Sequence, residues 1–241
     1  MSEHTIRHEG DRCIMVSLGQ VIDESTGLKC LALADQLRAL NLAGVQDIVA
    51  SYVSVAVHYT PDPALGNDPA GAIKEAIHNT LTTLSDQSLT QLSGQVVRLP
   101  ICYGGAHGPD LEEAATMAGL SPEAFIQAHH AQPLRVFSLG FAPGQPYIGV
   151  HDERFAIPRR ATPRTAVPPG SLGVANRQST LYPNVLPGGW MIIGATPVPL
   201  FDAHASEPSR LNPGDTVYFE PISEAEFDAI RRANPTQESR S

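Results

Sequence analysis

Hydrophobic residues recur with two different periods in the first hundred residues, one typical of strands and the other of helices. Residues 13–18, 45–51, 52–59 and 94–104 are rich in β-branched and apolar residues, and within 52–59 valines alternate with small or polar residues, as in a strand. Residues 25–40 and 68–84 instead repeat leucine or isoleucine at helical spacings, and Ser25 or Thr26 is the expected N-cap of the first of these helices. The resulting order β-α-β-β-α-β is that of a ferredoxin-like split βαβ unit. We therefore predict a ferredoxin-like α/β domain over residues 1–100.

Residues 101–241 have a different pattern of apolar and polar residues. Asp110 and Ser121 are N-cap residue types, and they precede two short helical segments at 111–120 and 122–130. Short apolar runs separated by glycine and proline then follow at 134–141, 171–176, 190–197 and 215–222. Frequent short strands with turn signals are typical of a β-barrel or sandwich. The whole chain is thus predicted to be α+β, with a second, mostly β domain that begins with helices.

Composition and charge exclude several classes of protein. Apolar residues make up 42% of the 241 residues and charged residues 17%, as in a soluble globular protein. A formal net charge of -9 argues against a nucleic-acid partner. No apolar run approaches the roughly 18–20 residues of a membrane helix, and the polar N-terminus lacks the core of a signal peptide. Three scattered cysteines indicate neither a metal cage nor a disulfide framework. We expect a cytoplasmic protein with no membrane partner and no metal.

Charge is unevenly distributed along the chain. From Arg154 to Phe201 there is no aspartate or glutamate, whereas five arginines occur at 154, 159, 160, 164 and 177. Guanidinium groups match carboxylate and phosphate geometry, so this stretch suggests a surface for a small anion. The alternative is that carboxylates from elsewhere in the fold neutralise these arginines.

Local motifs identify no complete catalytic unit. The chain has no GxxxxGK[ST] loop for nucleotide phosphates and no HExxH zinc motif. His129 and His130 form the only local concentration of imidazole. The segment LGFAPGQPYIG, residues 139–149, combines glycine, proline and aromatic residues, and is interpreted either as a tight corner or as a rigid rim facing a ligand.

Four blocks in fixed order resemble the allophanate hydrolase subunit 1 family. They are LPICYGGAHGPDLEEAA, FSLGFAPGQPYIG, IPRRATPRTAVPPGSLGVANRQSTLYP and LPGGWMIIGATP, and the likeness covers nearly the whole chain. This family includes the B subunit of bacterial 5-oxoprolinase, the sporulation-kinase inhibitor Kip and the carboxyltransferase region of urea carboxylases. The resemblance implies an N-terminal α/β domain and a cyclophilin-like β-barrel, here residues 101–241.

The resemblance also implies an activity and a site. The expected role is that of the 5-oxoprolinase B subunit, which works with the A and C subunits to open 5-oxo-L-proline to L-glutamate. The reaction uses ATP, which the complex rather than a P-loop of this chain would bind. By resemblance His129 is the candidate acid/base. The candidate substrate-binding residues are Arg135, Phe141, Pro143, Gly144, Tyr147, Arg159, Arg160, Arg164, Gln178, Gly188, Gly189 and Trp190.

Two alternatives remain open at this point. One is a Kip-like inhibitor of a histidine kinase, with Phe141 and Tyr147 as anchors; the other is a component of a urea- or allophanate-type carboxyltransferase or amidolyase. The sequence departs from the family pattern at several positions. Such changes would either alter which ligand binds or abolish activity. They are Ala106, His107, Gln145, Asn176, Arg177, Ser179 and Ala195.

Overall fold

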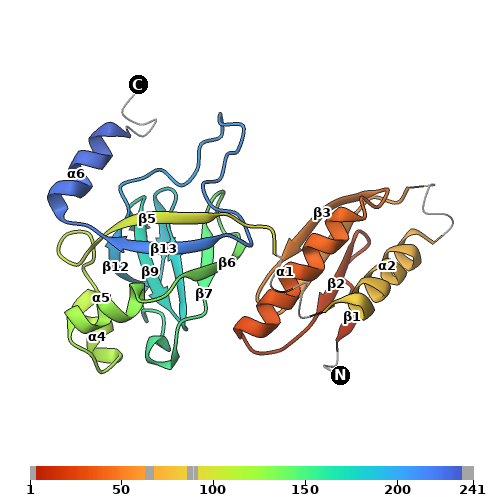
Figure 1. Cartoon of the computed structure of the whole chain (residues 1–241), viewed down its shortest axis with the longest axis horizontal. Helices are drawn as coiled ribbons and strands as arrows, with labels where there is room; N and C mark the ends of the chain where they lie inside the picture. The colour runs from red at the N-terminus through yellow and green to blue at the C-terminus, as the bar shows by residue number, and fades with distance from the viewer. Residues whose placement is uncertain (1–3, 63–67, 86–88, 90–91, 235–241) are drawn as a thin grey trace. The chain divides into compact units, whose positions relative to one another are not determined.

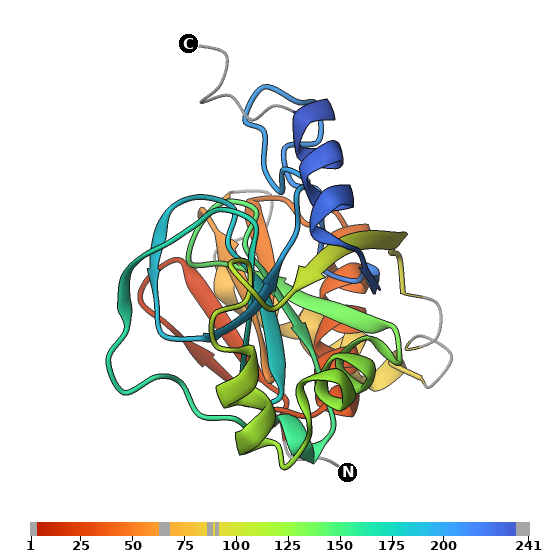
Figure 2. The same cartoon turned by 90° about the vertical axis from the view of Figure 1, so that its left-hand side faces the viewer.

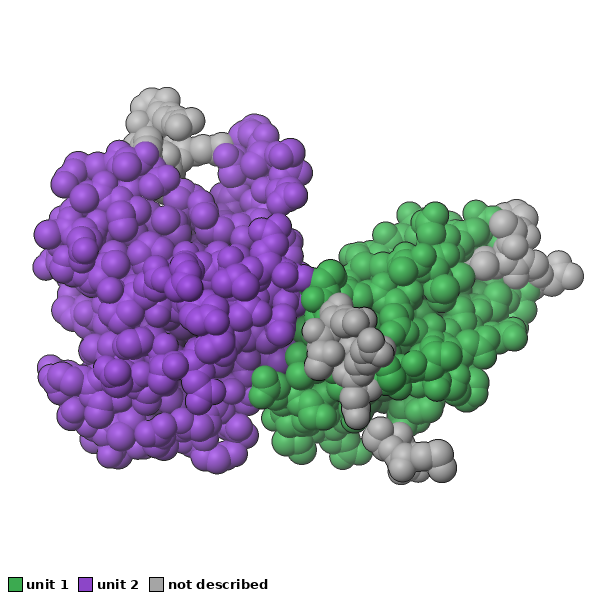
Figure 3. Space-filling model, in the orientation of Figure 1, with its two compact units in different colours: residues 1–93 green, residues 94–241 purple. Residues whose placement is uncertain are grey.

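The computed structural model describes residues 4–62, 68–85, 89 and 92–234. The chain forms two compact units, residues 1–93 and 94–241 (Figures 1 and 3). The expected domain limit at residue 100 lies inside strand β5, Val96–Tyr103, whose ladder partners all belong to the second unit. Among the described residues, no helix is long and apolar enough to cross a membrane.

The first unit is a four-stranded antiparallel sheet with two helices. The strands are β1 (Thr5–His8), β2 (Cys13–Ser17), β3 (Val45–Ala50) and β4 (Ser54–Tyr59), in the order β1-β2-β4-β3. The helices are α1 (Glu24–Ala39) and α2 (Pro69–Thr83). Leucines of α1 and isoleucines of α2 are buried, as their helical spacing predicts.

Two details of the predicted first domain are wrong. Residues 94–104 do not close this sheet; β1 takes that edge and pairs with β2 in register Thr5↔Ser17. The segment TIRH is short and polar, so it carries no strand signal of its own. Helix α1 is capped by Asp23 rather than by Ser25 or Thr26, since the Asp23 carboxylate accepts the Thr26 N–H at 2.9 Å.

The second unit is a closed seven-stranded barrel in the order β10-β7-β6-β13-β5-β12-β9. Besides β5, its strands are β6 (Leu134–Leu139), β7 (Pro146–Gly149), β9 (Ser171–Ala175), β10 (Gln178–Leu181), β12 (Met191–Ala195) and β13 (Thr216–Pro221). A two-stranded ribbon of β8 (Arg164–Val167) and β11 (Leu186–Gly188) lies outside this ladder. Alternate residues of the strands, among them Leu99, Ile101, Ile148 and Leu181, fill the interior. The predicted mostly β domain is thereby confirmed.

Three helices accompany the barrel. Figures 1 and 2 show α4 (Leu111–Met117) and α5 (Pro122–His130) together, with α6 (Glu224–Ala233) at the other end of the unit. Ser121 caps α5 as predicted, its hydroxyl accepting the Ala124 N–H at 3.2 Å. Asp110 precedes α4 but makes no side-chain cap hydrogen bond. Its carboxylate instead accepts hydrogen bonds from Arg160 and Arg164.

Candidate functional site

An aromatic and cationic face lies on the outside of the barrel. Ile148 and Ser179 are opposed in the β7–β10 ladder and point inward, so their neighbours Tyr147 and Thr180, also opposed, point outward. Trp190 lies 6.0 Å from Tyr147 between ring centroids, and the Arg159 guanidinium lies over the Trp190 ring at 5.5 Å. We call Tyr147, Arg159 and Trp190 the outer face, in which Arg159 is exposed, Tyr147 is partly exposed and Trp190 is buried.

Glycine makes the close packing of Trp190 possible. A Cβ added to Gly173, on the neighbouring strand, would lie 2.8 Å from the Trp190 Cβ. A Cβ on Gly188 would collide with the Tyr182 hydroxyl, and one on Gly189 would approach the Pro163 ring at 3.6 Å. Gly188 therefore has a positional role, because only a residue without a Cβ fits against Tyr182, whereas the contact at Gly189 is an ordinary one that does not require glycine.

The segment after Arg159 is anchored by one buried carboxylate. Asp110, 4% exposed, accepts hydrogen bonds from Arg160 Nη1 at 3.0 Å, from Arg164 at 2.8 and 2.7 Å and from the Ile192 N–H at 2.7 Å. The arginines and the backbone donor hold the pKa of Asp110 below its usual range against the effect of burial. Because the Arg160 N–H also bonds to the Gly189 carbonyl at 2.7 Å, this segment is fixed beside Trp190.

The expectation of an uncompensated positive stretch is wrong for four of its five arginines. Arg160 and Arg164 share Asp110, Arg177 pairs with Glu153 at 2.7 Å, and Arg154 pairs with Asp152 at 2.6 Å. Carboxylates that precede the stretch, Asp110, Asp152 and Glu153, thus neutralise most of it. Arg159 is the exception, since it is exposed and forms none of the ion pairs found among the described residues. Of these five guanidinium groups, all within the described residues, that of Arg159 alone is available to an anion without breaking an ion pair.

His129 lies inside the barrel unit, away from solvent. It is 1% exposed, its Nδ1 lies 2.9 Å from the Tyr103 hydroxyl, and its Nε2 lies 2.9 Å from Ser179 Oγ. His151 Nε2 lies 2.8 Å from the same Ser179 oxygen. Burial lowers the pKa of His129 well below its usual value and that of His151 to about 4, so both rings are neutral at pH 7. Neither ring nitrogen of His129 is free for a substrate in this arrangement.

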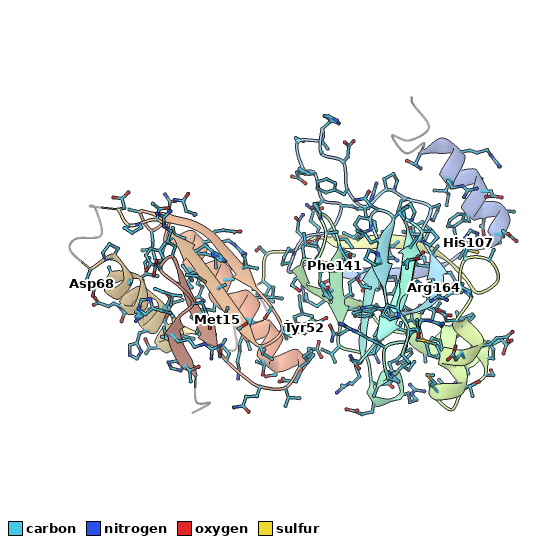
Figure 4. The ribbon with its side chains drawn as sticks, turned by 180° about the vertical axis from the view of Figure 1, so that it is seen from behind. Met15, Tyr52, Asp68, His107, Phe141 and Arg164 are labelled. Carbon is cyan, nitrogen blue, oxygen red and sulfur yellow. The ribbon has the colours of Figure 1, made fainter. Side chains whose placement is uncertain are left out.

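Segment 139–149 divides into two parts with different surroundings. Residues 139–144 line a groove of about 830 Å³, whose other wall is Phe201, residues 206–209 and Asn212. Phe141 is 68% exposed and has a left-handed backbone, φ 70°. Gly144 allows the two walls to meet, since a Cβ there would lie 2.7 Å from the Phe201 Cβ. Phe141 and Pro143 thus belong to this groove, and Figure 4 shows Phe141 apart from Arg164.

The rest of the segment is strand, contrary to the expectation from its prolines. Pro146–Gly149 forms β7 and pairs with both β6 and β10. The Gln145 side chain is buried, and its Nε2 donates to Thr180 Oγ1 at 3.2 Å. Gln178 is buried on β10, and Arg135 of β6 donates to the Gly214 carbonyl at 2.6 Å, which ties two parts of the barrel together.

Several departures from the family pattern have structural counterparts. Asn176 and Arg177 both have left-handed backbone, φ 50° and 66°, in the β9–β10 turn. Ala195 packs with Cys102 and with Phe227 of α6. The His107 ring lies 4.0 Å from that of Phe227, and Figure 4 shows His107 beside α6.

Sequence reasoning missed Tyr103, His151, the ion-pair role of Asp110 and the contacts of Ser179, which was named only as a departure from the family pattern. They come from separate elements, and only the closed barrel brings them together. Asp110 had a detectable but misleading signal, because an aspartate before a helix is normally a cap. Among the residues that the structure describes, no three His, Cys, Asp or Glu side chains gather as a metal site.

The fold defines a class of protein: an α+β chain with a four-stranded antiparallel sheet followed by a closed seven-stranded barrel. Residues 4–211 match the family described as carboxyltransferase domain, subdomain C and D, and the chain belongs to that family. The B subunit of 5-oxoprolinase from Bacillus subtilis (strain 168) is 34% identical over 237 residues, which cover 94% of this chain and 98% of that protein. The chain is thus a homologue of the 5-oxoprolinase B subunit.

Two further relatives support this assignment. The B subunit of 5-oxoprolinase from Escherichia coli O157:H7 is 39% identical over 157 residues, 65% of this chain and 72% of that protein. The crystal structure of TTHA0988 matches with a TM-score of 0.73 and 32% identity over 88% of this chain. The match covers only 40% of TTHA0988, so the present chain corresponds to less than half of that longer polypeptide.

Proposed function

We propose that this chain is the B subunit of an ATP-dependent 5-oxoprolinase-type complex, which opens the lactam of 5-oxo-L-proline to give L-glutamate. The observation that carries the proposal is the match to a 5-oxoprolinase B subunit over 98% of that protein's length. A match of this extent includes both units of the chain and the outer face, rather than one shared domain.

The outer face suits a small cyclic carboxylate. Arg159 offers a guanidinium without an ion-pair partner among the described residues, and its planar donors fit a carboxylate. Tyr147, which is partly exposed, offers a ring and a phenol hydroxyl near that cation, and the buried Trp190 ring packs beside it. In this proposal Arg160 and Arg164 act indirectly, because their bonds to Asp110 hold the backbone that carries Arg159.

Partner proteins complete the active site in this proposal. The chain has no phosphate-binding loop motif, so ATP is handled by homologues of the 5-oxoprolinase A and C subunits. TTHA0988, which is more than twice as long as the matched region, is consistent with this fold working beside further protein. The exposed Phe141 at the rim of its groove is a suitable anchor for such a partner.

The test is reconstitution. We expect the isolated chain to show little or no turnover, and the chain mixed with homologues of the A and C subunits to release ADP in a 5-oxoproline-dependent manner. Arg159→Ala is expected to raise KM for 5-oxoproline about tenfold or more, because a charge-assisted contact to the substrate is lost. Arg98→Ala is the matched control, since Arg98 is exposed on β5 and pairs with Glu220. An Arg159→Ala complex with unchanged KM would remove the outer face from the substrate site.

A further inference from the structure

A single hydrogen-bond chain crosses the interior of the barrel. It comprises Tyr103 at the end of β5, His129 on α5, Ser179 on β10 and His151 after β7. We call these four hydrogen-bonded residues the buried chain. Its three links measure 2.9, 2.9 and 2.8 Å. In the closed strand order, β5 and β10 are three strands apart in one direction and four in the other, so the links join opposite walls.

The surroundings of the buried chain keep water away. Ser179 is fully buried, and Phe219 and Phe155 lie against the imidazoles, with centroids 4.9 Å from His129 and 4.6 Å from His151. The charged or titratable groups that act on the two rings are His130 for His129, and Asp152 and Arg177 for His151, besides the rings themselves. An apolar site of this kind favours neutral rings, so protons must be shared without separating charge.

The Ser179 hydroxyl dictates where the ring protons lie. It has one proton, so it can donate to only one of the two Nε2 atoms that face it. The other Nε2 must then carry a proton and donate to Ser179 Oγ. Two neutral histidines around one hydroxyl therefore hold opposite tautomers, one protonated on Nε2 and the other on Nδ1.

Two proton arrangements satisfy every link of the buried chain. In the first, the Tyr103 hydroxyl donates to His129 Nδ1, His129 Nε2–H donates to Ser179, and Ser179 donates to His151 Nε2. In the second, every link is reversed. Passing from the first to the second, one proton enters at the Tyr103 oxygen, each inner group gains one proton and loses one, and one proton leaves His151 Nδ1.

We propose that the buried chain is a proton relay through the barrel, with Ser179 and Tyr103 as the residues that position and couple the two histidines. This rests on the proposed function, because opening a lactam requires a proton on the leaving nitrogen and the removal of one from water. The relay moves these protons through the rings of His129 and His151, which the substrate does not touch. The interior stays neutral in both arrangements.

Tautomers in the isolated chain test the relay without any partner. Long-range ¹H–¹⁵N correlation on ¹⁵N-histidine protein at pH 7 is expected to show His129 and His151 neutral and in opposite tautomers. His151→Leu should fix His129 with its proton on Nδ1, because Ser179 is then free to donate to Nε2. Tyr103→Phe should favour the other tautomer, because a protonated Nδ1 would lack an acceptor. The same single tautomer in both rings of the wild type, or no response to these variants, overturns the relay.

Turnover of the reconstituted complex tests the use of the relay. Ser179→Ala is expected to lower kcat on the order of tenfold to hundredfold with little change in KM. Ser179→Thr keeps the hydroxyl and is expected to restore kcat and the wild-type tautomers. A Ser179→Ala complex with wild-type kcat overturns the relay. A wild-type complex that does not turn over 5-oxoproline contradicts the proposed function instead, and the tautomer measurement still decides the relay.

Discussion

Asp110 shows how a single side chain holds a functional segment in place. Its carboxylate accepts four hydrogen bonds, from Arg160, twice from Arg164 and from the Ile192 N–H. Removing it leaves two partly buried cations and a buried backbone donor without their acceptor. We expect Asp110→Ala to lower the free energy of unfolding by about 3–5 kcal/mol, as measured by urea denaturation. Glu113→Ala, which removes only a 3.8 Å exposed contact to Arg160, is the control and should change it little.

The buried histidines make stability depend on pH. His151 has a pKa of about 4 in the folded chain, against about 6.5 when unfolded, so the unfolded chain binds more protons between these values. The contribution of His151 to stability is therefore fully present above pH 6.5 and is lost as pH falls from 6.5 through 4. We expect His151 alone to make the protein about 2 kcal/mol less stable at pH 5 than at pH 7.

Urea denaturation at these two pH values, in the wild type and in His151→Leu, measures that contribution. The variant removes one titrating group, so its stability should change less between pH 7 and pH 5. An equal change in both proteins would show that His151 does not carry the linkage. His130, which is half-buried on the same helix as His129, provides a control through His130→Leu.

At the scale of elements, α6 is attached to the barrel by little more than one ring. Phe227 is its buried residue, packing on Cys102 and Ala195 and lying 4.0 Å from the His107 ring. Phe227→Ala should therefore release α6 while the barrel stays folded, because the barrel interior is a separate cluster. Hydrogen exchange should show faster exchange in residues 224–233 and unchanged protection in β9 and β12. Arg232→Ala, at an exposed position of the same helix, is the control. Joint loss of protection in α6 and β12 would contradict this picture.

The elements that were predictable share one property: their own residues carry the signal. Helices α1, α2 and α5 and strands β9, β12 and β13 were predictable because their apolar spacing is local, and for α5 the Ser121 cap is local too. Strand β7 was not, since the prolines of segment 139–149 suggest a bend, and its strand character comes from pairing with β6 and β10. Strand β1 was missed because a short polar edge strand is recognised only through its partner.

The same distinction applies to the candidate site. Arg159, Tyr147 and Trp190 were named from the sequence by resemblance, and the fold places them side by side. The neutralisation of Arg160 and Arg164 was not predictable, because their carboxylate lies about fifty residues earlier in the chain. Contacts of this length depend on barrel closure, and a single sequence carries no spacing rule for them.

At the scale of the whole molecule, each unit has its own buried core and its own sheet. Every member of the barrel core lies in residues 94–241, and the ladder partners of β1 to β4 all lie within the first unit. The buried chain and the outer face also lie entirely in the second unit. We therefore expect residues 94–241, expressed alone, to fold cooperatively and to keep the opposite tautomers of His129 and His151.

This fragment also separates two sources of the pH dependence. If the histidines cause it, the fragment should lose stability between pH 7 and pH 5 by the same amount as the full chain, because each of their contacts is retained. Urea denaturation of both proteins at the two pH values measures this. A fragment that folds but shows no such loss would assign the effect to residues 1–93. A fragment that fails to fold would show that the barrel depends on the first unit. That result would contradict the independent folding expected from the separate cores of the two units.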